Sequence, residues 1–206
     1  MDKFIDYIFS LFVENEYEPI SPHHIFKHKK HDDFWYVTEN VKLYDDQEDF
    51  HNSLVDFYKT YPVAEKNMSI LFLVDEKFPL EQSIKIEKDP FFFKKYVLNY
   101  SEEAYKELCG LLQSNKGINI SDLVMQEDVY EQMMKSGDNL NGASLLYAII
   151  HKLPFIFIHV KQKNIDGDFI KIESSGLLSK VNECEDEESI EKLLDDLLNV
   201  NEDGKD

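Results

Sequence analysis

The feature that most constrains the fold is a continuous apolar run, ILFLV, at residues 70–74. The run has the length of a β-strand and contains no polar position, so neither of its faces can lie against water. We therefore expect a central strand that is covered on both faces.

Hydrophobic periodicity predicts the elements around this strand. Ser101, followed by two glutamates, is a good helix start because its hydroxyl can cap free amides. Apolar spacings of three and four predict further helices, which cover residues 2–14, 48–60, roughly 121–135, 142–152 and 190–198. Alternating or β-branched and aromatic segments predict strands, which cover residues 33–39, 83–88, 91–100, 155–160 and 169–174.

These elements predict an α+β fold, because helices and strands are mixed along one chain without a Pro, Gly or Ser-rich linker. We expect a single domain over residues 1–200, with a mixed, mostly antiparallel sheet and about six helices. Residues 201–206, NEDGKD, are expected to form a flexible acidic tail.

The charge of the chain excludes some functions. Its formal net charge is −19, and all 22 basic residues are lysines. Without arginine the chain can supply neither an arginine finger nor a bidentate guanine contact. The negative charge repels nucleic acid as a whole, and it leaves one alternative open: an acidic DNA mimic or inhibitor protein.

Cysteine usage and hydropathy indicate a cytoplasmic protein. Cys109 and Cys184 are the only two cysteines and lie far apart, so no disulfide framework is expected. The apolar N-terminus is interrupted by Asp2 and Asp6 and resembles an amphipathic helix more than a signal peptide. The longest apolar runs are too short to cross a bilayer.

The segment HHIFKHKKH is rich in histidine and lysine. On a helix, His24, His28 and His31 would share one face and could bind zinc, and a metal-dependent hydrolase or nuclease that uses the segment 23–31 is a second alternative. Pro22 and the lysines favour instead a solvated loop or short helix without metal. The lysines of this basic patch are candidates for a phosphate or acidic-partner contact: Lys27, Lys29 and Lys30.

Catalytic motifs are missing from the sequence. The segment SGDNLNGAS (136–144) has Ala143 where a phosphate-binding loop has its lysine, and a helix cap and turn explain both glycines. There is no G-x-S-x-G motif, and His159 lies in an apolar strand pattern. We therefore expect no enzymatic activity and no cofactor.

The segment EKDPFFFKKYVLNY (87–100) combines aromatic and charged residues. If residues 91–100 form one strand, each face carries a lysine beside aromatic rings, which favours an edge strand or a surface covered by a partner. In the alternative interpretation the rings fill the core on both sides of the strand and the lysine stems run along it. The candidate partner-binding residues are Asp89, Phe91, Phe93, Lys94, Lys95 and Tyr96.

The segments FWYVTEN, FPLEQSIKIEKD and PFFFKKYVLNY together resemble the middle component of bacterial ABC-three-component defence systems, the group that includes Lamassu. The matching order is an acid, aromatic residues, a basic pair and an apolar strand, here Asp89, Lys94, Lys95, Tyr96 and Val97. The resemblance implies a non-enzymatic adaptor that bridges an SMC/Rad50-like ATPase and an effector nuclease, in defence against phage or plasmids. It implies no catalytic residues.

Overall fold

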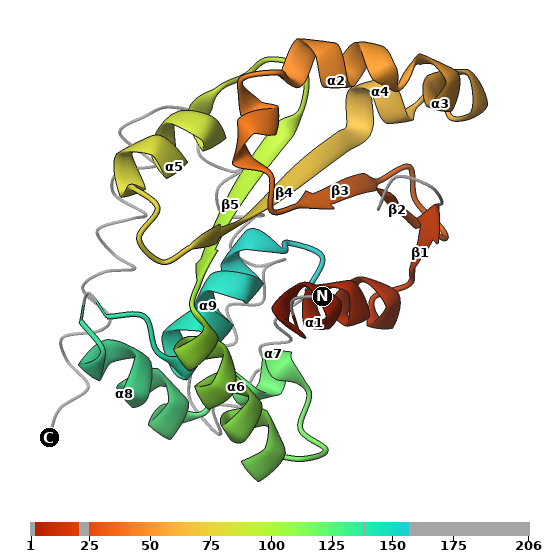
Figure 1. Ribbon diagram of the computed structural model, residues 1–206. Coiled ribbons are helices and arrows are strands. Elements are labelled where there is room, and N and C mark those ends of the chain that lie inside the picture. The colour runs from red at the N-terminus through yellow and green to blue at the C-terminus, as the bar shows by residue number, and fades with distance from the viewer. Residues whose placement is uncertain (1–2, 21–24, 138, 157–206) are drawn as a thin grey trace, which may run out of the picture. The chain divides into compact units, whose positions relative to one another are not determined.

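The apolar run 70–74 lies within strand β4 (Met68–Asp75), of which every residue except Asp75 is buried. The computed structural model describes residues 3–20, 25–137 and 139–156 (Figure 1). Successive β4 side chains point to opposite faces. Leu71 and Leu73 join one hydrophobic cluster, while Ile70 and Phe72 join the other. The prediction of a strand covered on both faces is confirmed.

The sheet has five strands within the described residues, in the order β1-β2-β3-β4-β5. The strands besides β4 are β1 (Tyr17–Ile20), β2 (Ile25–His28), β3 (Phe34–Thr38) and β5 (Lys94–Tyr100). The first three pair antiparallel, whereas β3, β4 and β5 pair parallel. The prediction of an α+β fold with a mixed sheet is therefore confirmed, although the sheet is not mostly antiparallel.

Helices cover both faces of the sheet (Figure 1). The two parallel connections carry η1 (Val41–Tyr44), α2 (Gln47–Ser53), α3 (Val55–Thr60), α4 (Ala64–Asn67) and α5 (Leu80–Lys88). The sheet grows in one direction from β3 to β5, so crossovers of the same hand place these helices on one face. The other face packs against α1 (Lys3–Glu14), α6 (Glu102–Ser114), α7 (Ile120–Leu123), α8 (Glu127–Lys135) and α9 (Gly142–Lys152).

Helix ends follow the local sequence. The Ser101 side chain accepts a hydrogen bond from the Ala104 amide, as expected for an N-cap. Gly137, with φ +56°, follows α8, and Asn141 caps α9 through a reciprocal capping box with Ser144. Residues 136–137 thus form a helix end with a turn, and residues 141–144 form a new helix start, which confirms that Gly137 and Gly142 lie at helix ends and not in a phosphate-binding loop.

Three predictions about segments that form helices are wrong in detail. Residues 83–88 form the end of helix α5 rather than a strand, with Ser83 and Ile86 buried three positions apart. The predicted helix 48–60 is divided at Leu54, and the predicted helix 121–135 is divided between Leu123 and Glu127. The described residues contain nine α-helices instead of about six, because two predicted helices are each divided and α4 and α5 form where no helix was predicted.

Several predictions concern residues outside the described part of the chain. They include most of the strand 155–160, the strand 169–174, the helix 190–198 and the tail 201–206, together with His159 and Cys184. Within the part that is described, no helix is both long enough and apolar enough to cross a bilayer.

Candidate functional site

Two adjacent phenylalanines project from the segment that leads into β5. Phe91 has 67% of its surface exposed and Phe92 has 43%, whereas Phe93 is buried at 4%. Exposed aromatic side chains of this size are costly in water and are typical anchors of protein interfaces. We call Phe91 and Phe92 the aromatic tip, and residues 89–93 the tip segment.

The backbone of the tip segment is strained. Phe92 has φ +61°, which is uncommon for a bulky residue, and the Phe93 amide donates a 2.7 Å hydrogen bond to the Phe91 carbonyl. A hydrogen bond between residues two apart around a positive φ is the mark of a γ-turn, a rare and strained conformation. Strain of this kind persists only where the surrounding structure holds it, and it gathers at functional sites.

The ammonium group of Lys95 holds the tip segment from inside. Its side chain is buried, and Nζ donates to the carbonyl oxygens of Phe91 at 2.6 Å, Asp89 at 3.1 Å and Phe93 at 3.2 Å. Nζ also lies 3.5 Å from the Asp89 carboxylate. Burial lowers the pKa of Lys95, and the nearby Asp89 charge opposes that effect. One cation thus binds three alternate carbonyl groups of the tip segment, on both sides of the turn at Phe92.

Asp89 ties the tip segment to its neighbours. Its carboxylate accepts hydrogen bonds from the Phe91 amide at 3.0 Å and from Gln47 Nε2 at 2.9 Å. Burial by itself raises the pKa of Asp89, but these hydrogen bonds and the Lys95 charge outweigh it and hold the pKa below its ordinary value. The carboxylate is therefore ionised at neutral pH and supports the turn.

Aromatic rings beneath the tip give it a firm base. The His51 ring centroid lies 5.5 Å from that of Phe92 and 5.7 Å from that of Phe93, and Phe50 packs against Phe93 at 5.8 Å. Helix α2 supplies both His51 and Phe50. Phe92 therefore packs on one side against His51, whereas Phe91 is the more exposed of the two rings.

Beside the tip lies a cavity of about 390 Å³ at the start of β4 and β5. Phe92, Lys94 and Tyr96 line one part of it. Lys94 Nζ lies 5.2 Å from the Tyr96 ring centroid, and Tyr96 stacks on Trp35 at 4.9 Å. The cavity adds aromatic and charged surface next to the tip, and Asp32 and Asp33 line it as well as Lys94.

The predicted partner-binding residues take different positions in the structure. The structure brings all six together at the start of β5, yet Phe93 and Lys95 are buried and Asp89 is partly buried, so these three act as supports of the surface. Phe91 and Lys94 are exposed.

The sequence analysis missed Phe92, because it assumed a strand through residues 91–93 and the γ-turn breaks that strand. The Asp89-Pro90 dipeptide was the one signal for a turn here.

The predicted lysine patch lies around the turn between β2 and β3. Lys27 lies in β2 with its Nζ 3.3 Å from the His28 carbonyl oxygen, and Lys29 is exposed. Lys30 forms a 2.8 Å ion pair with Glu16. Because one of the three charges is paired with a carboxylate, the patch is less basic than its sequence indicates. Its contact with phosphate or an acidic partner stays a prediction.

The described part of the histidine segment, residues 25–31, forms strand β2 and the start of the turn that follows it, and not a helix. His28 ends β2, and its Nδ1 accepts hydrogen bonds from the amides of Lys30 at 3.0 Å and His31 at 3.1 Å. Burial, with the neighbouring His31, lowers the pKa of His28 and favours the neutral ring that can accept these bonds. The His31 ring stacks on it at 4.5 Å. His28 thus stabilises the turn after β2 by accepting hydrogen bonds from two of its backbone amides.

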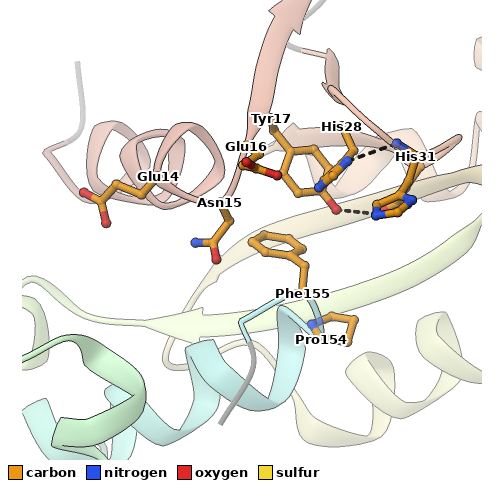
Figure 2. A pocket seen from close by; sticks show the side chains of 9 residues that line it. Glu14, Asn15, Glu16, Tyr17, His28, His31, Pro154 and Phe155 are labelled. Carbon is orange, nitrogen blue, oxygen red and sulfur yellow. Dashed lines mark hydrogen bonds between the residues drawn. The ribbon is translucent and has the colours of Figure 1, made fainter. Parts of the chain in front are cut away.

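A pocket next to these histidines, whose lining side chains are drawn in Figure 2, has a volume of about 550 Å³. The Tyr17 hydroxyl donates to the Asp33 carboxylate, which also accepts from Trp35 Nε1 at 3.0 Å. Burial and the bond to Asp33 raise the pKa of Tyr17 well above its ordinary value, so the phenol stays protonated.

In the described part of the chain, no group of three or more His, Cys, Asp or Glu side chains is placed to hold a metal ion. His23 and His24 lie outside that part.

The comparisons with known proteins support one family. Residues 33–120 match the family model of the ABC-three component (ABC-3C) system Middle Component 1. No curated protein and no solved structure matches the chain. The matched segment contains the whole parallel part of the sheet and the aromatic tip. The resemblance to the middle component of ABC-three-component systems is therefore confirmed over this segment, which is similar to a subunit of a multi-component system.

Proposed function

We propose that the chain is a non-enzymatic adaptor of a bacterial defence complex and acts in the cytoplasm. It bridges an SMC/Rad50-like ATPase and an effector nuclease, and the aromatic tip contacts one of them. The observation that carries this proposal is the braced tip: a buried lysine and a strained turn hold Phe91 in solvent, within the segment similar to Middle Component 1. A protein gains nothing for its own stability from such an exposed ring.

The chemistry of the tip suits a protein partner. Phe91 offers an apolar anchor, and Lys94, three residues further along the chain, adds an exposed cation, a combination that is common in interface hot spots. The strain in the turn gives the ring a fixed position before binding, which reduces the entropy lost when a complex forms. The partner surface is expected to present an apolar pocket with acidic residues at its rim.

The first prediction tests the tip. The chain is co-expressed with the products of the genes that flank its own, which the proposal expects to be the ATPase and the effector. The affinity of each product for the purified chain is then measured by calorimetry. Phe91→Ala should weaken binding to one subunit by about thirty-fold, the loss of about 2 kcal/mol expected at a hot spot. Its melting temperature should stay unchanged, because the Phe91 ring is mostly exposed.

A matched control separates a specific contact from non-specific hydrophobic association. Leu80→Ala removes another large exposed apolar side chain, 73% exposed at the start of α5, and should leave the affinity unchanged. Equal losses for both variants, or binding that survives Phe91→Ala, would contradict the role of the tip. The absence of any complex with either neighbouring subunit would contradict the adaptor proposal itself.

A further inference from the structure

A second exposed apolar surface lies on helix α8 and on the turn before it. Tyr130 is 49% exposed and Met134 is 59% exposed, and one helical turn separates them on the same face. Met125, just ahead of the helix, is 55% exposed. We call these three residues the α8 stripe. All three lie beyond residue 120, outside the segment that matches Middle Component 1.

The α8 stripe rests on a packed support. Val129, on the inner side of the helix, is fully buried in the core. Tyr147 of α9 donates from its hydroxyl to the Val124 carbonyl at 2.6 Å, and its ring lies 6.4 Å from that of Tyr130. Helix α8 is thus fixed from below, so the exposed side chains are a feature of the folded state.

Carboxylates flank the α8 stripe. Glu127 and Asp128 lie in the first turn of the helix and form no ion pair within the described residues. Glu131 is paired with Lys135 at 2.7 Å. The surface therefore combines an apolar line with net negative charge, and it attracts a partner with the opposite pattern.

We propose that the α8 stripe docks an amphipathic helix of a partner protein that carries lysine or arginine beside its apolar face. Side chains at i and i+4 fit the face of a helix, and methionine adapts its shape to different apolar partners. A second copy of this chain fits poorly, because the same carboxylates would meet across the interface. This surface is independent of the aromatic tip, and it would give the adaptor a second docking site.

The second prediction tests the α8 stripe with a synthetic probe. An 18-residue Leu/Lys peptide, patterned as an amphipathic helix, is titrated into the full-length isotope-labelled chain, and backbone amide shifts are followed by NMR. The largest shifts should fall on residues 125–135, and binding should weaken as salt rises. Tyr130→Ser with Met134→Ser should weaken the affinity by about tenfold or more, with an unchanged circular dichroism spectrum.

Three controls make the result decisive. A peptide of the same composition in scrambled order keeps the charge but has no apolar face, and a Leu/Glu peptide keeps the apolar face but reverses the charge. Both should bind much more weakly. Ile118→Ser, at a side chain 40% exposed between α6 and α7, should leave the affinity unchanged. Equal binding of the scrambled peptide, shifts centred elsewhere, or no effect of the double variant would overturn the proposal. So would a concentration-dependent dimer that is lost in the double variant.

Discussion

At the scale of single residues, Lys95 shows how a buried charge can serve a surface. Among the described residues it is the only buried residue that carries a charge. Removing an ammonium group from water costs several kcal/mol unless polar groups replace the water. Three carbonyl oxygens and the Asp89 carboxylate do so here, and all four acceptors belong to the tip segment. The buried ammonium group therefore stabilises the particular conformation of the turn that exposes Phe91.

The third prediction follows from these contacts. Lys95→Met keeps most of the apolar stem but leaves the three carbonyl oxygens without their donor and the Asp89 carboxylate without its nearby positive charge. We expect the free energy of unfolding to fall by about 3 kcal/mol, as for the loss of one partner of a buried ion pair. Urea unfolding measures this change, and hydrogen exchange of the Phe93 amide should become faster as the γ-turn opens.

Lys94→Met is the matched control for this prediction. Lys94 is the exposed neighbour of Lys95, and its Nζ lies over the Tyr96 ring. Its loss should change the free energy of unfolding by less than about 1 kcal/mol, in the range of exposed cation–π contacts. Similar effects of the two substitutions would show that Lys95 does not hold the tip segment.

At the scale of elements, helices α6 and α9 meet at an unusually close point. An added Cβ at Gly142 would lie 2.5 Å from the Leu108 nitrogen and 2.7 Å from the Glu107 carbonyl carbon. The Gly142 amide also donates to the Glu107 carboxylate at 2.9 Å. Because the obstructing atoms belong to the backbone of α6, no rotamer change can relieve the clash. The contact requires glycine at position 142.

The fourth prediction compares two helical glycines. Gly142→Ala should lower the free energy of unfolding by about 2 kcal/mol, since α9 must move away from α6. Gly110→Ala, in the interior of α6 with nothing within 4 Å of an added Cβ, should raise it by about 0.5–1 kcal/mol through helix propensity. Chemical unfolding of both variants measures the difference. Stabilisation by both substitutions would disprove the close approach.

At the scale of the whole described fold, one side chain joins the helices on both faces of the sheet across the edge of β5. The Glu87 carboxylate of α5 accepts from the Val97 amide at 2.8 Å and from Lys152 Nζ of α9 at 2.5 Å. An edge strand presents unpaired amides that can recruit another strand. Glu87 occupies one of these amides, so β5 is an edge within the described residues that is partly closed to pairing.

The fifth prediction concerns this edge. Glu87→Ala should lower the free energy of unfolding by about 1–2 kcal/mol, because the Val97 amide loses its acceptor. Hydrogen exchange of that amide should be faster. Lys152→Ala removes only the partly exposed ion pair and should cost about 0.5 kcal/mol. If Val97 exchange is equally slow in Glu87→Ala, the carboxylate does not protect the edge.

The sequence by itself determined the elements whose signals are local. The apolar run of β4, the helical periodicity of α1 and α9, and the cap at Ser101 depend on residues within one or two turns of each other, and all are found as predicted. The segment 83–88 was misjudged because Ile84 and Ile86 alternate with polar residues, as on one face of a strand. The structure instead exposes Ile84 and buries Ile86 together with Ser83, three positions apart, as on one face of a helix. Because β4 and β5 are parallel, the chain between them must cross over the sheet, usually as a helix. This requirement depends on the pairing of two strands and is not visible in the residues 83–88 themselves.

Only the tertiary structure decided the character of the candidate site. The sequence identified the aromatic and basic stretch before β5, but the assumed strand gave Phe91 and Phe93 the same role. Burial of Phe93 against α2 and the capture of Lys95 by three carbonyl oxygens separate the exposed anchor from its supports. The physical reason is that solvation and strain at the tip depend on contacts between segments more than forty residues apart, such as Gln47 with Asp89, which no local pattern records.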